Sequence, residues 1–472
     1  MQKNLIAAAV ATLGLSSAAH ALGPSSLPAQ YTIYAGGGSS QAQAVIYLAS
    51  QLLSNVDSYT DGTCNGKQSS NYRIFFGTLK SAQGTATAGS SVLLYYAMGQ
   101  GDFPNGVSPT AKASTNSYPS NVAGASACSS QTFPLPSYTV AASPTVAAVP
   151  DWGLSNLEPK IENNTYNVTN AAPSNLLTAA QVGNLTTKPV WDAIFGIVET
   201  ATAYTDACPK TNFSRTELQG ILSGGIQDWS QLKGDNGCSI TAGPIVLLDR
   251  APGAGVKTAS NLYFLGYPNN GNTPPNDIAN GATTYNGTRV ACNGDYEDVN
   301  ESSNGNIVAD VQTANSKGDA CRAIGLLSAE YAPALNGGGY DFVAINGVDP
   351  GLNGSTSATY TTAISGDYDF VFTNDFNYRT KQVGSNAQHW SGDGTVYSSL
   401  ITAALNIFNS TSLPGGSPTA TTNSPAGVLL DPAGAGTFAN CMTRVTRYGI
   451  SQAPAQVYWD FSYTAPSCSD TL

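Results

Sequence analysis

Short runs of β-branched and aromatic residues alternate with helical patterns along this chain, and this alternation constrains the fold more than any other feature. Runs of strand length occur at residues 31–34, 72–76, 91–96, 194–198, 245–248 and 370–372. Between them, residues 41–53 place Val45, Leu48 and Leu52 on one helical face, and residues 214–217 (SRTE) form a capping box that opens a second helix. Strands that alternate with helices predict an α/β fold.

The length and the composition limit the architecture and the partners. A chain of 472 residues exceeds what one hydrophobic core usually organises, so at least two domains or lobes are expected. Charged residues make up only 10% of it and the net charge is -11, which disfavours nucleic acid and anionic membranes as partners. The absence of an internal repeat disfavours a solenoid or a propeller. Stretches rich in Gly, Ser, Thr, Asn and Pro predict loops at residues 102–130, 268–287 and 411–425, the last as a flexible surface loop.

Residues 1–21 have the form of a signal peptide. Lys3 precedes an apolar stretch at residues 5–15, and the sequence Ala-His-Ala at residues 19–21 has the small-x-small form of a cleavage site. We therefore expect export to the periplasm or to the outside of a bacterial cell. The apolar stretch is shorter than the roughly 20 residues of a membrane span, and no later stretch qualifies, so no membrane insertion is expected.

All eight cysteines follow the predicted cleavage site. An even number of cysteines in an oxidising compartment predicts disulfide bonds rather than metal ligation, and no CxxC spacing argues for zinc. Many pairings are compatible with the sequence, and among them we favour Cys208 with Cys238 and Cys292 with Cys321 first. The complete set is Cys64, Cys128, Cys208, Cys238, Cys292, Cys321, Cys441 and Cys468.

Histidine is scarce, which limits the chemistry available to the chain. His20 leaves with the predicted signal peptide, so only His389 remains. A Ser-His-Asp triad would have to use His389, but no GxSxG nucleophile elbow accompanies it. A surface or packed histidine is therefore the expectation, and no catalytic residue, no metal site and no cofactor is predicted.

Three glycine-rich turns follow predicted strands and carry the candidate binding residues. In the first turn, three glycines precede Ser39 and Ser40 just before a predicted helix, where main-chain N–H groups and hydroxyls suit an oxyanion. In the second, Ser155 and Asn156 follow a Trp-Gly strand end and offer side-chain donors. The alternatives are an ordinary strand-to-helix turn in the first case and an Asx turn in the second.

The third turn combines a cation with glycines. A strand delivers Arg250, whose planar fork can bind an anion with two hydrogen bonds, and Gly253, Ala254 and Gly255 then present main-chain amides beside it. The alternative is a surface ion pair between Arg250 and Asp249 or a glutamate. In a chain with only 19 Lys plus Arg, this placement favours an anion site.

Read together with residues 212–232 (NFSRTELQGILSGGIQDWSQL), these turns resemble the phosphate-binding, PstS-like branch of the type 2 periplasmic-binding-protein superfamily. Residues 221–229 are similar to that family's "IFSGxIxxW" segment. Residues 323–328 (AIGLLS) and 340–350, which include INGV, supply further matches. The matches follow the family's order from about residue 33 to residue 372, whereas the last hundred residues match loosely.

The resemblance implies two α/β lobes around a ligand cleft, with long loop insertions. Lobe 1 would comprise residues 22–200 and 363–472, and lobe 2 residues 201–362. It further implies capture of phosphate or a related small oxyanion without covalent chemistry, an ABC permease as a partner, and a monomer. The family's Ser-Gly-Gly loop would fall at residues 98–106. The ligand-binding residues implied are Ser39, Ser40, Ser155, Asn156, Arg250, Gly253, Ala254 and Gly255.

Three positions depart from the family pattern and keep other functions open. Asn156 stands where the family has an Asp that repels fully ionised oxyanions, so sulfate-like ligands would no longer be excluded. Ala254 and Val256 replace hydroxyl residues, and each missing charge-assisted hydrogen bond costs about 1.5–3 kcal/mol. An extracellular structural or adhesive protein on a degenerate scaffold therefore stays as an alternative. A secreted phosphatase is a weaker one, because neither a metal-ligand cluster nor an activated nucleophile is found.

Overall fold

The structure is a computed structural model that describes residues 29–61, 71–99, 101–120, 125–128, 135–140, 145–164, 176–266, 283–285, 290–292, 294–333, 337–351, 362–363, 367–379, 394–408 and 428–430. Several predictions concern residues outside these ranges. They are the signal peptide, the loop at residues 411–425, His389, Cys64, Cys441 and Cys468. The predicted loop at residues 268–287 also lies outside them except for residues 283–285, which form a strand instead of a loop.

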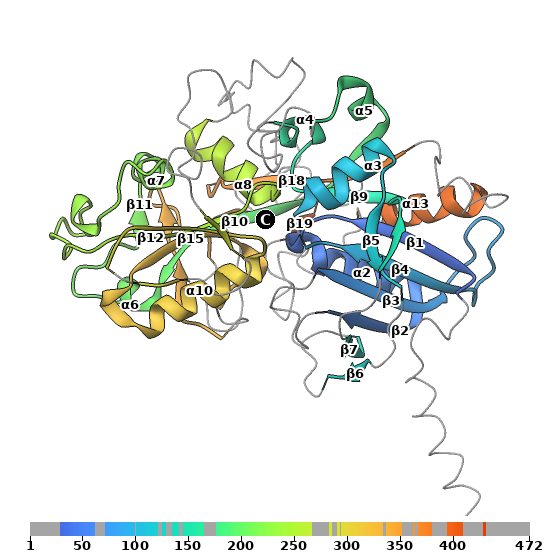
Figure 1. Ribbon diagram of the computed structural model, residues 1–472, viewed down its shortest axis with the longest axis horizontal. Helices are drawn as coiled ribbons and strands as arrows, with labels where there is room; N and C mark the ends of the chain where they lie inside the picture. The colour runs from blue at the N-terminus through green and yellow to red at the C-terminus, as the bar shows by residue number, and fades with distance from the viewer. Residues whose placement is uncertain are drawn as a thin grey trace, which may run out of the picture.

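The chain forms two lobes that lie side by side, each with its own hydrophobic core (Figure 1). The first core contains Ile33, Leu48 and Leu94, and the second contains Leu248 and Ile307. We call the first body lobe 1 and the second lobe 2. The predicted α/β class and the predicted two-lobed architecture are confirmed.

Lobe 1 is built on a mixed sheet. Its strands are β1 (Tyr31–Gly36), β2 (Leu53–Thr60), β3 (Tyr72–Leu79), β4 (Ser91–Ala97) and β9 (Trp152–Ser155), in the order β9-β1-β4-β3-β2. Strand β1 is parallel to both β4 and β9. Smaller strands are β5 (Asn116–Pro119), β6 (Ser126–Ala127), β7 (Ser137–Thr139) and β8 (Thr145–Ala148).

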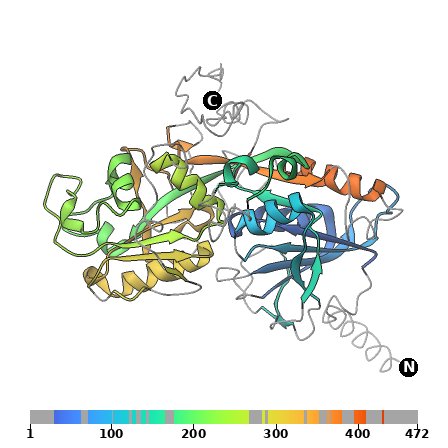
Figure 2. The ribbon, with the colours of Figure 1, turned by 45° about the horizontal axis from the view of Figure 1, so that its top comes forward.

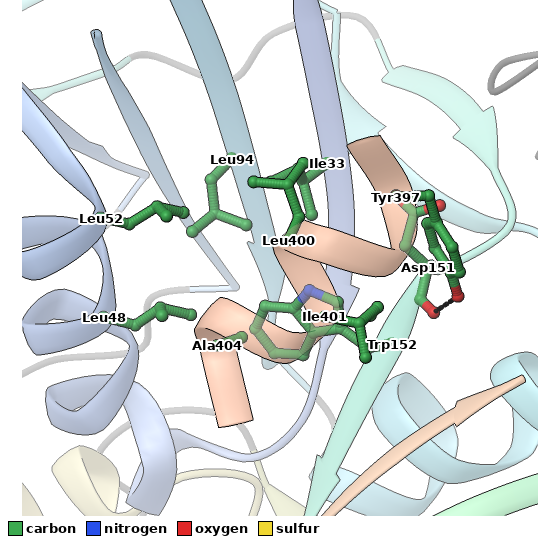
Figure 3. Close-up of a pocket in the computed structure, with 10 residues that line it drawn as sticks. All are labelled: Ile33, Leu48, Leu52, Leu94, Asp151, Trp152, Tyr397, Leu400, Ile401 and Ala404. Carbon is green, nitrogen blue, oxygen red and sulfur yellow. Dashed lines mark hydrogen bonds between the residues drawn. The ribbon is translucent and has the colours of Figure 1, made fainter. Parts of the chain in front are cut away.

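Two long helices cover one face of this sheet, namely α2 (Ala42–Leu52) and α13 (Gly394–Phe408). Figure 3 shows Leu48 of α2 and Leu400 of α13 directed toward Ile33 of β1 and Leu94 of β4, around a small apolar pocket. The Tyr397 hydroxyl donates to the Asp151 carbonyl at 3.1 Å at one end of this pocket. The pocket belongs to the core of lobe 1, since its lining is almost entirely apolar.

The segment after β4 is more ordered than predicted. Residues 102–130 read as a loop in the sequence, but they contain η4 (Phe103–Val107), α3 (Ser108–Lys112) and β5. A proline lies near the start of both helical turns, where it needs no N–H partner. The turns bury Phe103, Val107 and Ala111, and this packing stabilises helical structure that local composition does not predict.

Lobe 2 contains a largely parallel sheet. Its strands are β12 (Val246–Arg250), β13 (Thr283–Tyr285), β14 (Glu297–Glu301) and β15 (Ala323–Ser328), in the order β13-β14-β12-β15. Its helices are α6 (Ala201–Tyr204), α7 (Arg215–Leu222), α8 (Gly255–Ser260) and α10 (Asn304–Ser316). The remaining short elements of this lobe are β11 (Asn212–Phe213), η6 (Trp229–Gln231), η7 (Asn261–Leu265), η8 (Gly318–Ala320), η9 (Ala329–Tyr331), β16 (Tyr340–Phe342) and β17 (Ala344–Ile345).

Two antiparallel strands connect the lobes, β10 (Leu185–Thr200) and β18 (Val371–Arg379). Strand β10 pairs with β15 of lobe 2, and β18 pairs with β9 of lobe 1. In β10, Trp191 packs in the core of lobe 1 and Ala193 packs in the core of lobe 2. In β18, Phe372 packs in the core of lobe 2 and Phe376 packs in the core of lobe 1. Figure 2 shows both strands running between the lobes. The domain boundaries after residues 200 and 362 stay predictions.

The other described elements surround this connection. They are η3 (Ser39–Gln41), α4 (Pro159–Glu162), α5 (Ala179–Gly183) and β19 (Val428–Leu430), which pairs with β10. No helix within the described ranges combines the length and the hydrophobicity that a membrane crossing needs.

Both favoured disulfide bonds are present. Cys208 bonds to Cys238 and Cys292 bonds to Cys321, with Cα–Cα distances of 5.9 and 5.3 Å. Cys128 is also disulfide-bonded. The two named bonds tie irregular segments of lobe 2 to its core, and they constrain the unfolded chain more than the folded one.

One carboxyl group in lobe 2 is buried without hydrogen bonds. Glu199 lies near the end of β10 and is fully buried, and among the described residues neither of its carboxyl oxygens has a hydrogen-bond partner. Burial raises the pKa of Glu199 well above its ordinary value, and the positive charge of Arg322 only partly opposes that rise. The folded chain therefore keeps a proton on Glu199 that the unfolded chain releases.

This proton makes the stability of the protein depend on pH. Above the ordinary pKa of a glutamate the folded state binds more protons than the unfolded state, so the free energy of unfolding falls as pH rises. We expect Glu199→Gln to remove this fall, so that its stability relative to the wild type increases by about 1.4 kcal/mol per pH unit. Urea unfolding monitored between about pH 5 and pH 8 measures the difference.

Glu217→Gln is the control for this prediction. Burial alone would raise the pKa of Glu217, but hydrogen bonds from Lys210 and Ser214 outweigh burial and hold that pKa below its ordinary value. The stabilisation that Glu217 provides is therefore lost only when the pH falls below the ordinary pKa of a glutamate. Between about pH 5 and pH 8, the free energy of unfolding of Glu217→Gln should change with pH as that of the wild type does. If the free energy of unfolding of Glu199→Gln also changed with pH as that of the wild type does, the assignment of a buried proton to Glu199 would be contradicted.

Candidate functional site

The loops that follow β4 and β12 meet between the two lobes. The main-chain N–H of Phe103 donates to the carbonyl of Gly253 at 3.2 Å. Gly101 has a φ of +102°, and a Cβ at this position would lie 2.3 Å from the Gly253 carbonyl oxygen. Only glycine allows the two backbones to approach so closely. The lobes are therefore in direct main-chain contact at this point.

The carboxylate of Asp102 lies at the centre of this contact. One of its oxygens accepts the main-chain N–H of Asn156 at 2.7 Å, and the other accepts that of Gly255 at 2.5 Å. Asn156 follows β9 in lobe 1, and Gly255 opens α8 in lobe 2. Asp102 itself is fully buried. One carboxyl group is thus held by main-chain amides from both lobes.

Gly255 leaves no room for a side chain at this contact. A Cβ on it would lie 2.2 Å from a carboxylate oxygen of Asp102 and 2.5 Å from the Cβ of Asn156. The preceding Ala254 has no side-chain cap for the helix, and the Asp102 carboxylate instead satisfies the first free N–H. The small residues at 253–255 therefore permit the close approach that brings the amides together.

The side chain of Asn156 belongs to a second set of hydrogen bonds. Its amide oxygen accepts from the Ser40 hydroxyl at 3.0 Å and from the Gln41 Nε2 at 2.7 Å. Gln41 Nε2 also donates to the Asn374 side chain at 3.1 Å, and Gln41 Oε1 accepts the N–H of Gly38 at 2.5 Å. These bonds connect the turn after β1, the loop after β9 and the crossing strand β18. The position of the Asn156 main-chain N–H is thereby restricted.

Two buried donors in this neighbourhood have no partner. The Ser39 hydroxyl and the Asn374 Nδ2 are within residues that are 8% and 1% exposed, and neither group is hydrogen-bonded to a residue that the structure describes. Ser39 directly precedes Ser40, and Asn374 shares Gln41 with Asn156. A buried donor that lacks a partner costs about 1–3 kcal/mol. An acceptor-rich guest at this place would satisfy both groups.

Arg250 is buried within lobe 2 and donates to neutral acceptors. Its Nε binds the carbonyl of Glu301 at 3.1 Å, and its Nη2 binds the carbonyl of Ser302 at 3.0 Å. Its Nη1 donates to the Asn304 side-chain oxygen. The guanidinium therefore fastens the loop between β14 and α10 to the end of β12.

Asp249 has a different cationic partner from the one considered in the sequence. Its carboxylate accepts the main-chain N–H of Arg250 at 2.7 Å and forms a buried ion pair with Lys257 of α8. Both side chains are at least 98% buried. The charge of Asp249 is thus balanced by α8, and the Arg250 side chain is directed to the loop after β14.

Ser155 is bonded across the sheet rather than to the interlobe contact. Its hydroxyl accepts from the Asn377 Nδ2 of β18 at 2.8 Å, and Asn377 Oδ1 accepts from Thr187 of β10 at 2.8 Å. The residue is fully buried. Ser155 therefore links β9 to the crossing strands.

A second acid, Glu162 of α4, lies beside Asp102. Burial, followed by the charge of Asp102 and a hydrogen bond with it, raises the pKa of Glu162 well above its ordinary value. One Glu162 oxygen accepts the main-chain N–H of Leu157 at 3.2 Å. The raised pKa favours the protonated form of Glu162 beside Asp102.

Three solved structures resemble this one to a limited degree. The first is a phosphate ABC transporter substrate-binding protein from Clostridium perfringens with bound phosphate, at 12% identity and a TM-score of 0.40 over 79% of this chain and 92% of that chain. The second is an ABC-type phosphate transport receptor from Vibrio cholerae, at 14% identity and a TM-score of 0.30 over 55% of this chain and 78% of that chain. The third is PstS from Borrelia burgdorferi, at 16% identity and a TM-score of 0.26 over 47% of this chain and 74% of that chain. No protein-family model matches the chain, and no curated protein matches it. The two-lobed α/β fold rests on the coordinates of this chain.

The structure brings part of the predicted site together. Ser40, Asn156, Gly253 and Gly255 lie within one hydrogen-bonded region between the lobes, with Ser39 next to it. Arg250 and Ser155 bind groups of the scaffold, as described above. Four further residues of this region were not predicted from the sequence, namely Asp102, Gln41, Glu162 and Asn374. The only available signal was for Asp102, which follows a glycine in the loop expected at residues 98–106.

The described residues of this region do not form a metal-binding cluster. In the described part of the chain, no group of three or more His, Cys, Asp or Glu side chains is arranged to hold a metal ion. The side chains at the contact between the lobes are amides, hydroxyls and two carboxyl groups.

Proposed function

We propose that this chain is an exported solute-binding protein that takes a small oxyanion between its two lobes, without covalent chemistry. The observation that carries the proposal is the Asp102 carboxylate, which is bound by the main-chain amides of Asn156 in lobe 1 and Gly255 in lobe 2. Donors that hold a carboxylate so closely have the geometry to hold the oxygens of another small anion.

The unpartnered donors support the same proposal. Ser39 and Asn374 offer a hydroxyl and an amide N–H beside the Gln41 and Asn156 side chains. A tetrahedral oxyanion has more acceptor oxygens than a carboxylate and could satisfy these groups in addition to the amides. The resemblance of residues 212–232 to PstS-like proteins makes phosphate the first guest to test. A periplasmic or secreted location, an ABC permease and a monomeric state are parts of this proposal.

Calorimetry and thermal unfolding of the mature protein with phosphate, arsenate, sulfate and acetate test the proposal. We expect at least one oxyanion to bind, and a concentration of 100 times its dissociation constant should add about 2.7 kcal/mol to the free energy of unfolding. Ser39→Ala should weaken that binding by about tenfold, because one hydrogen bond to a charged group is lost.

Ser50→Ala is the matched control. Ser50 lies on α2 in the same lobe. Its hydroxyl donates to the Tyr47 carbonyl at 2.7 Å and accepts from the Gln51 side chain at 3.4 Å, and both partners belong to that helix. It should bind as the wild type does. Equal affinity in the Ser39→Ala and Ser50→Ala chains would place the anion away from the turn after β1.

The same geometry favours one further candidate function. Asp102 already occupies the amides, and Arg250 donates to its own lobe, so a structural protein could use the contact as a permanent link between the lobes. Such a protein would bind none of the four anions. An adhesion assay on the exported protein, compared with a strain that lacks it, then gives the positive test.

A further inference from the structure

We propose that Asp102 is a built-in ligand, whose carboxylate occupies the anion site and holds the two lobes together when no solute is bound. An external oxyanion then binds by displacing Asp102. This inference rests on the proposed function and adds the regulation of that site.

The first argument is the match between the carboxylate and the donors. Both Asp102 oxygens are used, one by the N–H of Asn156 and one by the N–H of Gly255, at 2.7 and 2.5 Å. Buried main-chain N–H groups require an acceptor. With Asp102 in place, these two donors are satisfied without any solute, which is the condition for a ligand-free closed state.

The second argument is that the contact joins the lobes. Asp102 comes from the loop after β4 in lobe 1, and Gly255 belongs to α8 in lobe 2. The neighbouring bond from Phe103 to the Gly253 carbonyl joins the same two loops at 3.2 Å. A charged acceptor makes the stronger of these two bonds. Loss of the carboxylate therefore removes the main attraction between the loops at this place.

The third argument is electrostatic. An oxyanion that entered beside the fully buried Asp102 side chain would bring a second acidic group within a few Å of the first. Glu162 lies next to Asp102 and adds no cation. The guest and the Asp102 side chain would also accept the same two main-chain N–H groups, so binding of one requires departure of the other.

The competition has a measurable consequence. The apparent affinity for an oxyanion is reduced by the fraction of molecules in which Asp102 leaves the site free. If that fraction is about one tenth or less, removal of the carboxylate raises the affinity by about tenfold or more. Removal of the Asp102 carboxylate also allows the two lobes to separate when no anion is bound.

The test compares the wild type with Asp102→Ala in buffer free of phosphate and sulfate. Small-angle X-ray scattering should give a larger radius of gyration for Asp102→Ala, and hydrogen exchange of the amides at residues 253–260 should be at least about tenfold faster. Calorimetry should then show tighter binding of inorganic phosphate or sulfate to Asp102→Ala. Asp319→Ala removes an exposed carboxylate from lobe 2 and should match the wild type in all three measurements.

The outcomes separate this inference from the proposed function. Unchanged scattering and exchange in Asp102→Ala overturn the built-in ligand, whether or not anions bind. Weaker phosphate binding to Asp102→Ala also overturns it, because Asp102 would then be an acceptor for a protonated guest. If Asp102→Ala opens but neither chain binds an anion, the link between the lobes is supported and the proposed function is rejected.

Discussion

Replacement of Gly255 by alanine is expected to prevent closure of the lobes and to weaken oxyanion binding by about 100-fold or more. The new Cβ would lie 2.2 Å from the Asp102 carboxylate and 2.5 Å from the Cβ of Asn156. The latter atom is attached directly to the backbone and cannot rotate away. Because each lobe has its own packed core, the strain is relieved most easily by separation of the lobes.

Gly255→Ala and Asp102→Ala should therefore differ in one decisive respect. Both should increase the radius of gyration, but Asp102→Ala frees the amides for a solute, whereas Gly255→Ala keeps the amides of the two lobes apart. Gly243→Ala is the matched control, since no atom lies within 4 Å of the position of its Cβ. Wild-type affinity and wild-type scattering of Gly255→Ala would show that the anion binds without contact between these loops.

Arg250→Ala is expected to lower the free energy of unfolding of lobe 2 by about 3–5 kcal/mol. The guanidinium is 98% buried or more, and it holds the carbonyls of Glu301 and Ser302 and the side chain of Asn304. Its removal takes one donor from each of these three acceptors and leaves a cavity at the end of β12. The Glu301 carbonyl still accepts the N–H of Ala251 at 2.9 Å. Lysine cannot replace this planar fork, so Arg250→Lys should recover only a minor part of the loss.

Urea unfolding in anion-free buffer measures this effect directly. Lys233→Ala is a suitable control in the same lobe, because Lys233 is exposed and makes one bond to Ser239 at 3.0 Å, so a change within about 0.5 kcal/mol is expected. If Arg250 bound the oxyanion instead of the loop after β14, the variant would give the opposite result. In that case Arg250→Ala would keep its stability and lose oxyanion binding.

Much of the fold could be predicted because it depends on neighbours in the sequence. The capping box at residues 214–217 forms as expected, with the Ser214 hydroxyl accepting the N–H of Glu217 at 3.1 Å. The amphipathic pattern at residues 41–53 became α2, and the apolar run at residues 194–198 lies within β10. These patterns repeat over three or four residues, so the sequence alone displays them.

The predicted site was incomplete for a physical reason. Asp102 and Gly255 are 153 residues apart, and Gln41 and Asn374 are 333 residues apart. Nothing in the local sequence of Asp102 shows that two distant amides will need an acceptor. The same applies to Arg250, whose residue type suits an anion but whose acceptors, in the loop after β14, are 51–54 residues away.

The alternation of strands and helices and the division into more than one core follow from periodicity, length and composition, whereas the two cysteine pairs were favoured among many that the sequence allows. The tertiary structure alone decided which donors face which acceptors across the two lobes. Hydrogen bonds act over about 3 Å, and the folded chain, rather than spacing along it, brings such groups within that distance. For this reason the sequence pointed to the glycine-rich turns, while the coordinates identified the carboxylate that lies between them.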